Sequence, residues 1–293
     1  MLSVLIPTYN YNITELIKQL LSQLNQVRFK YEIIVLDDAS TDNNIIVANN
    51  ALCKNPPCIY HSNPENLGRT ATRQTLANMA KFNYLLFLDA DVLPKNDNFI
   101  DQFNISEQTA DVVFGGITYS QKPPDCNKIL RWKYGKAREA KTIKEREQMP
   151  YLSIISQCIL IKKQLFQQAN NFYKNVYGVD VLFAQNLEKL KAKVIHIDNP
   201  IIHLGLEENK AFISKTIKGL HSLYKFETSG KIPDNYRPIQ KAYKWLHRYK
   251  LNSFYISLIK LIEGAVLKNL NSNNPSLLLF DFYRLYIYAK LHQ

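Results

Sequence analysis

Short apolar runs alternate with helix-spaced stretches over the first third of the chain. Residues 3–7, 31–36 and 84–88 are mostly hydrophobic runs, which is typical of strands buried on both faces of a sheet. Residues 13–24 carry apolar side chains at helical spacing, and 41–52 and 70–80 are further predicted helices. This alternation predicts an α/β fold, with a mostly parallel sheet flanked by helices.

The same pattern continues more loosely toward the C-terminus. The helix predicted at 41–52 has Ser40 or Thr41 as its N-cap. A strand is predicted at 58–60. Further strands are expected at 111–117, 156–162 and 194–197, and a further helix at 182–190. From residue 212 onward helices dominate, with loops near 230–238 and 271–275. We therefore expect an α/β region over 1–205 and a helical region over 206–293.

Polar residues follow three of the predicted strands directly. Pro7, Thr8 and Tyr9 end or follow the first strand, Asp37-Asp38 the second, and Asp89-Ala90-Asp91 the strand at 84–88. Ligands of parallel α/β sheets bind beyond the carboxyl ends of the strands. We expect these three strand ends to meet in one crevice.

The acids and the neighbouring basic residues point to a phosphate-bearing ligand. Two carboxylates such as Asp89 and Asp91 suit Mg²⁺ or Mn²⁺, which complete their coordination with water and phosphate; the alternative is a turn in which Asp91 is a cap. A carboxylate such as Asp38 can accept the N–H of a uracil-like base. Residues 63–73 lead into a helix start with Arg69 and Arg73, which suits phosphate, or form a surface loop with solvated arginines.

Composition and the cysteine pattern indicate in which compartment the protein works. Hydrophobic residues make up 46% of the 293 residues, and the formal net charge is +12. The four cysteines, at 53, 58, 126 and 158, show no metal-finger spacing, and we expect free thiols in a reducing compartment. The N-terminal residues lack the basic start of a secretion signal, and no apolar run reaches the roughly 20 residues of a membrane span. We expect a cytoplasmic protein.

Four segments carry a family resemblance. SVLIPTYN, EIIVLDDASTDN, NPENLGRTATRQ and FLDADVLP, in this order and spacing, resemble the family-2 glycosyltransferases of GT-A fold, over roughly residues 1–205. The resemblance implies a nucleotide-sugar half at 1–115, an acceptor half at 116–205 and a C-terminal helical extension. It also implies a UDP- or GDP-sugar donor, Mn²⁺ or Mg²⁺ as cofactor, and inverting transfer to a hydroxyl of a glycan or lipid-linked acceptor in cell-surface polysaccharide synthesis.

The resemblance also implies roles for particular residues. Asp38 would bind the nucleobase, Asp89 the ribose or an ion-bound phosphate, and Asp91 the metal. Arg73 occupies the place of the family's arginine, although the following Gln74 departs from the family's asparagine. The remaining residues implied to line the nucleotide-sugar site are Pro7, Thr8, Tyr9 and Asn66.

The second half of the chain must supply the acceptor chemistry. Asp180, in the segment YGVD, matches the catalytic base of the family's YGxED element, with Val179 where glutamate is common; its alternative role is a helix cap. His203 matches a histidine aimed at the metal or diphosphate, or is structural. Trp132 stacks on an acceptor sugar, or belongs to the core.

Other classes of function stay open at this stage. A sugar-phosphate nucleotidyltransferase needs a glycine-rich basic loop after its first strand, which PTYNYN is not. A non-catalytic glycosyltransferase-like binding protein is the other alternative, for which Val179 is the one hint. The basic, aromatic helices after residue 205 indicate peripheral contact with the inner face of the cell membrane, or they pack on the catalytic region or form a dimer. We expect no nucleic-acid partner.

Overall fold

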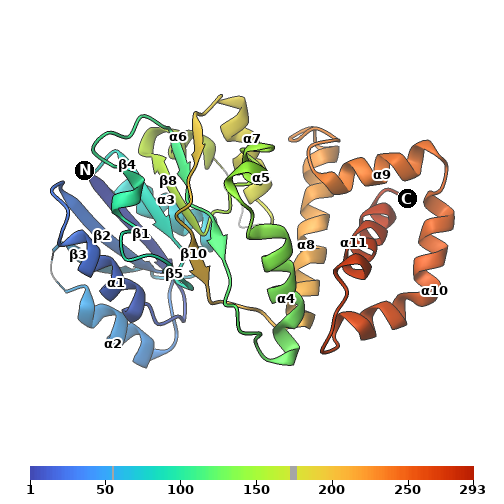
Figure 1. Cartoon of the computed structure of the whole chain (residues 1–293), viewed down its shortest axis with the longest axis horizontal. Helices are drawn as coiled ribbons and strands as arrows, with labels where there is room; N and C mark the ends of the chain where they lie inside the picture. Colours follow the sequence, from blue (N-terminus) through green and yellow to red (C-terminus); the bar gives the residue numbers. More distant parts are fainter. Residues whose placement is uncertain (55, 172–176) are drawn as a thin grey trace. The chain divides into compact units, whose positions relative to one another are not determined.

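A seven-stranded sheet is the centre of the α/β region in this computed structural model, which describes residues 1–54, 56–171 and 177–293 (Figure 1). The strand order is β3-β2-β1-β4-β8-β6-β9. Neighbouring strands run parallel, except that β8 is antiparallel to β4 and β6. The strands are β1 (Leu2–Thr8), β2 (Tyr31–Asp37), β3 (Cys58–Ser62), β4 (Tyr84–Leu88), β6 (Val112–Phe114), β8 (Cys158–Lys162) and β9 (Val194–His196). The predicted mostly parallel sheet is confirmed.

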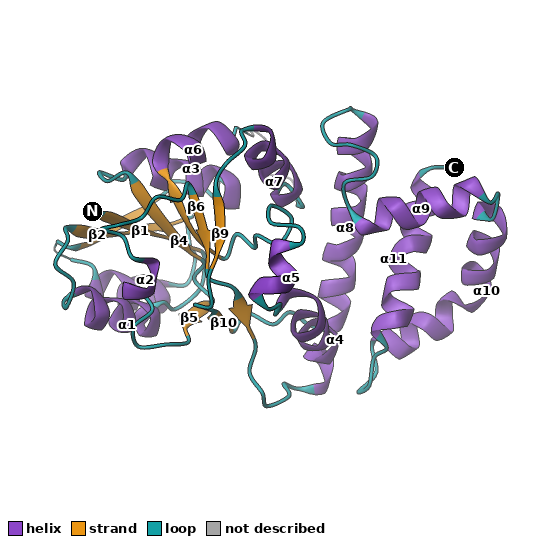
Figure 2. Ribbon diagram, turned by 45° about the horizontal axis from the view of Figure 1, so that its top comes forward, coloured by secondary structure: helices purple, strands orange, loops and turns teal. Residues whose placement is uncertain are grey.

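Helices cover both faces of this sheet. Figure 2 shows α1 (Thr14–Leu24) and α2 (Asn43–Leu52) on one face, and α3 (Arg69–Met79) and α6 (Lys163–Ala169) on the other. Successive strand residues point to opposite faces, so an uninterrupted apolar run fills both layers. The core on the α3 side includes Leu5, Ile34, Phe87, Leu76 and Phe166, all buried.

A three-stranded sheet of order β5-β10-β7 was only partly anticipated. It consists of β5 (Val92–Pro94), β10 (Ile201–His203) and β7 (Ile117–Thr118). The single strand predicted at 111–117 is divided into β6 and β7, because Gly116 between them has a φ of +100°, which favours glycine. Gly115 is also required, since a Cβ there would lie 2.1 Å from the carbonyl oxygen of Asn199.

The start of α2 differs from the prediction. Asp42 is its N-cap and accepts hydrogen bonds from the backbone N–H groups of Asn44 and Ile45, whereas Ser40 or Thr41 was expected. Ser40 instead accepts a hydrogen bond from the Asn10 N–H at 2.7 Å. Its hydroxyl therefore joins the loops after β1 and β2 rather than starting a helix.

The chain forms two compact units. The first contains residues 1–120, 139–171 and 183–205 of the described chain, and the second contains 121–138, 177–182 and 206–293. The first unit also holds α5 (Ile143–Glu147), and α7 (Asp180–Lys189) begins in the second unit and continues in the first. Whether function divides at residue 205 stays a prediction.

The second unit is helical, as predicted for the C-terminal region. Its core includes Phe212, Ile259, Phe280 and Tyr286. No helix in the described part of the chain combines the length and apolar character needed to cross a membrane. The helices of this unit are α4 (Ile129–Tyr134), α8 (Asn209–Thr228), α9 (Pro238–Arg248), α10 (Asn252–Leu270) and α11 (Leu277–Leu291).

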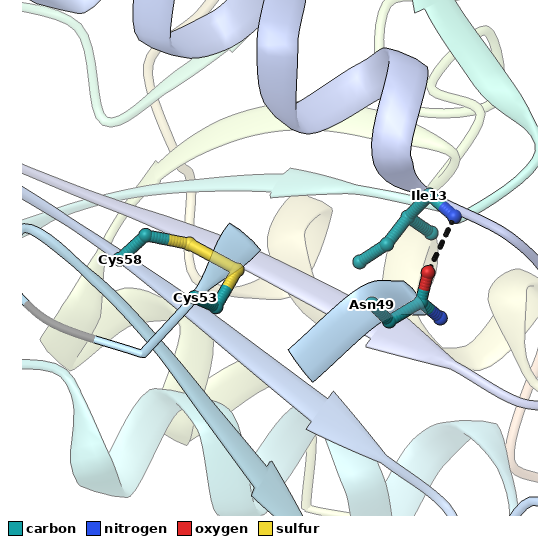
Figure 3. The surroundings of a disulfide bond; sticks show 4 residues. All are labelled: Ile13, Asn49, Cys53 and Cys58. Atoms are coloured by element: carbon teal, nitrogen blue, oxygen red, sulfur yellow. Dashed lines mark hydrogen bonds between the residues drawn. A yellow bond between two sulfur atoms is a disulfide. The ribbon is translucent and has the colours of Figure 1, made fainter. Parts of the chain in front are cut away.

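Two of the four cysteines are paired, so the expectation of free thiols is wrong for them. Cys53, just after α2, forms a disulfide with Cys58, the first residue of β3 (Figure 3). The short turn between helix and strand brings their Cα atoms to 4.6 Å, within the range a disulfide requires. Cys126 and Cys158 are free.

Candidate active site

The sheet has a switch point between β1 and β4. From β1 the chain adds β2 and β3 on one side and then returns to place β4 on the other. Loops leaving two strands at such a point diverge and leave a crevice at their carboxyl ends. The β1–β4 ladder ends at Leu5 opposite Phe87, whereas β1 continues to Thr8. The segments after β1 and β4, which carry the predicted site residues, therefore leave the same edge.

The loop after β1 is held in place from α2. Asn49 is fully buried; its side chain accepts the Ile13 N–H at 3.0 Å (Figure 3) and donates to the Tyr11 carbonyl at 2.9 Å. Thr8 is buried and its hydroxyl also donates to the Tyr11 carbonyl. Tyr9, which follows β1 directly, is 50% exposed.

Asp38 is buried and holds the loop that precedes α3. Its carboxylate accepts hydrogen bonds from the Asn63 side chain at 2.8 Å, the Leu67 N–H at 2.9 Å and the Gly68 N–H at 2.8 Å. Asn66 donates to the Asp38 carbonyl at 3.0 Å. A carboxylate can accept about four hydrogen bonds, so these three leave room for one more from a ligand.

Asp89 lies between two arginines of α3. Arg69 reaches one carboxylate oxygen at 2.8 Å, and Arg73 reaches the other at 2.5 Å. Both arginines also donate to Ser156, Arg69 to its hydroxyl and Arg73 to its carbonyl. Arg69 also acts electrostatically on Asp91, so the two guanidinium groups lie among two carboxylates. The more exposed Arg69 has 44% of its side chain in solvent, where its planar guanidinium suits a phosphate oxygen.

From the sequence, Asp89 and Arg73 were assigned to the nucleotide-sugar site. Arg69 was only named with Arg73 as suiting phosphate, and its contact with Asp89 was not anticipated. Its spacing of four residues from Arg73 puts both on one face of α3, and this signal was available. Ser156 carried no such signal.

Asp91 and His203 form a pair at the end of β4. The strand β10 pairs with β5 so that His203 lies opposite Val92, and its Nε2 is 3.3 Å from an Asp91 carboxylate oxygen. Burial raises the pKa of Asp91, but the hydrogen bond to His203 and the charges of His203 and Arg69 outweigh it, so the pKa is lowered overall. Asp91 is therefore ionised at neutral pH.

Two neighbours of Asp91 were missed from sequence. Gly205 lies so close that a Cβ would be 1.8 Å from an Asp91 carboxylate oxygen. Burial and the negative charge of Asp91 raise the pKa of Tyr11, which shows that this tyrosine is near the acid.

The Asp91–His203 pair has the geometry of two adjacent metal ligands. Ligands at about 2.1 Å from an octahedral Mg²⁺ or Mn²⁺ are about 3 Å apart, close to the 3.3 Å observed. An oxygen and an imidazole nitrogen form a donor set that Mn²⁺ accepts. Within the described residues no group of three or more His, Cys, Asp or Glu side chains is placed to hold an ion. The pair alone suits an ion whose other ligands are water and phosphate.

Asp180 and Trp132 belong to the second unit. Asp180 is the first residue of α7 and is exposed. Its negative charge raises the pKa of Arg237, although burial lowers that pKa overall. Trp132 is half-buried, with the Lys136 ammonium 4.6 Å from its ring centre. It lines a surface hollow of about 510 Å³ together with Lys133 and Pro275. The roles of Asp180 as base and Trp132 as acceptor contact stay predictions.

The fold and this site define the class of protein. A mostly parallel sheet with acidic residues beyond its switch point, and helices after it, is the GT-A architecture of glycosyltransferases, enzymes that transfer sugars. The chain belongs to glycosyl transferase family 2, whose family model matches residues 3–169. The resemblance inferred from the four sequence motifs is confirmed.

Known proteins similar to this chain are glycosyltransferases. An uncharacterized glycosyltransferase of Haemophilus influenzae is 26% identical, over 85% of this chain and 98% of that protein. A mannosyltransferase from Pyrobaculum calidifontis, solved with GDP-Man and Mn²⁺, has a TM-score of 0.61 at 18% identity, covering 99% of this chain and 86% of that one. Glucosyl-3-phosphoglycerate synthase from Mycobacterium tuberculosis, solved with Mg²⁺ and UDP, has a TM-score of 0.51 at 15% identity, covering 80% and 81%. At these identities the two structures establish the fold.

Proposed function

We propose that this glycosyltransferase takes its sugar from a UDP- or GDP-sugar and transfers it to a hydroxyl of a glycan or lipid-linked acceptor in cell-surface polysaccharide synthesis. The observation that supports this most is the Asp91–His203 pair, 3.3 Å apart at the switch point. Beside it, Arg69 and Arg73 bind the Asp89 carboxylate at 2.8 Å and 2.5 Å. A metal-ligand pair next to two arginines suits a diphosphate.

The donor site would be assembled from the first unit. Thr8 and Tyr9, after Pro7, line the nucleotide, and Asp89 contacts the ribose or a phosphate. Asp38 accepts a base N–H in addition to its loop hydrogen bonds, and Asn66 keeps that loop attached. Arg73 holds Asp89 in place.

Asp91 and His203 would hold Mn²⁺ or Mg²⁺ through a carboxylate oxygen and Nε2. When bound, such an ion neutralises the negative charge that develops on a departing diphosphate. The GDP-Man and Mn²⁺ of the Pyrobaculum calidifontis mannosyltransferase, and the UDP and Mg²⁺ of the Mycobacterium tuberculosis synthase, agree with this donor and cofactor chemistry.

The transfer would be a single displacement that inverts the anomeric carbon. The acceptor oxygen bonds to the anomeric carbon, the bond to the diphosphate oxygen breaks, and the hydroxyl proton passes to Asp180. A general base of this kind contributes roughly 10²–10⁴-fold to the rate. Trp132 would stack on a sugar of the acceptor. We propose that 1–205 carries the catalytic residues and that the helices of 206–293 are an extension.

The donor and the metal can be tested together by thermal unfolding with a panel of nucleotide sugars. We expect UDP- or GDP-sugars to raise the unfolding temperature with Mn²⁺ present and not after chelation. Asp91→Asn should lose this stabilisation, whereas Asp101→Asn, an exposed acid outside the site, should keep it. If no UDP or GDP compound stabilises the wild-type protein in the presence of Mn²⁺, the proposed donor is wrong.

The base needs its own test. Asp180→Asn should keep donor binding and lose at least about 100-fold in turnover with acceptor. An unchanged turnover number for this variant would remove Asp180 from the mechanism without affecting the donor assignment.

A further inference from the structure

The helix α10 is apolar on two opposite faces. One face packs into the core of the second unit through Ile256, Ile259, Val266 and Leu270, all buried. On the other side four large apolar side chains are exposed: Phe254 at 66%, Leu258 at 45%, Leu261 at 83% and Ile262 at 40%. Their spacing of i, i+4, i+7 and i+8 places them along one side of the helix. We call these four residues the α10 stripe.

The position of α10 within its unit explains why the stripe is uncovered. α10 packs against α11, and α11 packs against α8. In Figures 1 and 2, α10 lies on the far side of α11 from α8. The exposed fractions show that no described residue covers the stripe. A contiguous apolar face of this kind on the surface of a protein marks an interaction site.

The surroundings of the stripe are strongly basic. Residues 237–270 contain seven lysines and arginines and a single acid, Glu263. That acid accepts hydrogen bonds from Tyr283 and Tyr286 of α11, so its charge lies on the packed side of α10. The exposed Lys260 and Lys268 lie on α10 itself, and further exposed cations precede it at Lys241, Arg248 and Lys250. Lys244 is also exposed but pairs with Asp234 at 2.6 Å.

Aromatic residues with polar tips lie next to the stripe in sequence. Trp245 and Tyr249, at the end of α9, are 57% and 56% exposed, and their rings are 5.0 Å apart. Tryptophan and tyrosine favour the boundary between water and hydrocarbon, because one end of each ring is apolar and the other donates a hydrogen bond. A surface that faces only water would gain nothing from exposing these two rings.

Two occupants could cover this face, a second copy of the chain or a lipid surface, and charge distinguishes them. A second copy of the chain would bring two basic surfaces together, which costs free energy, whereas an anionic lipid surface attracts both. An apolar helical stripe flanked by lysine, arginine, tryptophan and tyrosine is the composition of helices that lie in a membrane interface. We propose that the α10 stripe inserts into the headgroup boundary of an anionic bilayer, with Lys260, Lys268 and the cations of α9 against lipid phosphates. This inference rests on neither the donor nor the metal proposed above.

The test is flotation of the full-length protein with lipid vesicles. We expect tight binding to phosphatidylcholine vesicles containing about one third phosphatidylglycerol, and at least tenfold weaker binding to pure phosphatidylcholine. Leu258→Ser/Leu261→Ser should lose at least tenfold in affinity for the anionic vesicles. Val47→Ser, at an equally exposed aliphatic residue of α2 (68%), should bind like wild type. All these side chains are exposed, so circular dichroism and thermal unfolding should match wild type.

A second variant separates charge from apolar contact. Lys260→Gln/Lys268→Gln should lower the affinity for anionic vesicles by about fivefold for each lysine, with no change for neutral vesicles. The proposal is overturned if wild type floats with neither kind of vesicle, or if Leu258→Ser/Leu261→Ser binds as tightly as wild type. It is also overturned if light scattering shows a dimer that this variant converts to a monomer, because the occupant would then be a second copy.

Discussion

At the scale of single residues, Gly205 determines where the Asp91 carboxylate can lie. A methyl group at residue 205 would be 1.8 Å from a carboxylate oxygen, so Gly205→Ala must displace Asp91. A displacement of about 1 Å in a site can cost about 10²-fold in rate. We expect kcat/KM with nucleotide sugar to fall at least tenfold. Gly264→Ala is the control, since nothing lies within 4 Å of its new methyl group; equal kcat/KM for the two variants would contradict this role of Gly205.

His196 should make stability depend on pH. Its Nε2 lies 3.1 Å from the Pro150 carbonyl oxygen, and burial together with the positive charge of Arg146 lowers its pKa. Below pH 6.5, its ordinary value, the unfolded chain binds a proton that the folded chain does not. Stability from this residue is therefore fully present above pH 6.5 and is lost as pH falls from there toward the folded pKa.

The effect is measured by urea unfolding at several pH values between 5 and 8. The wild-type free energy of unfolding should fall more steeply below pH 6.5 than that of His196→Gln, by up to about 1.4 kcal/mol per pH unit. Above pH 6.5 the two curves should run parallel. Parallel curves over the whole range would show that His196 takes up its proton equally in both states.

At the scale of elements, Asn49 couples α2 to the loop after β1. Asn49→Ala leaves the buried Ile13 N–H and the Tyr11 carbonyl without this partner, which costs about 1–3 kcal/mol in the free energy of unfolding. Asn50→Ala, on the same helix and exposed, should change it by less than about 0.5 kcal/mol. Because the loop carries Tyr9, we also expect a higher KM for the donor in Asn49→Ala alone. Urea unfolding and donor titration of both variants decide this, and matching behaviour would refute the coupling.

At the scale of the whole molecule, the net charge of +12 should make membrane binding depend on salt. Raising KCl from about 0.1 M to about 1 M shortens the Debye length from about 10 Å to about 3 Å. We expect affinity for anionic vesicles to fall at least tenfold, toward the affinity for neutral ones. Flotation across a salt series measures this, with neutral vesicles as the control. Salt-independent binding to anionic vesicles would mean that the basic residues of α9 and α10 do not contribute.

Local patterns determined much of this protein from sequence alone. The runs at 31–36 and 84–88 were correctly read as buried strands, because side-chain period and strand length are local properties. Parallel strands align their carboxyl ends, so Asp38, Asp89 and Asp91 were expected at one edge before any coordinates. The helical C-terminal region was predicted in the same way, from spacing along the chain.

Long-range pairing was decided only by the tertiary structure. His203 meets Asp91 because β10 pairs with β5 across more than a hundred residues, and no local period encodes that register. The buried side chain of Asn49 likewise depends on where α2 lies against its neighbours. The sequence predicted basic, aromatic helices after residue 205, but only packing decided which apolar side chains of α10 stay exposed, because a periodic pattern does not tell which face finds a partner.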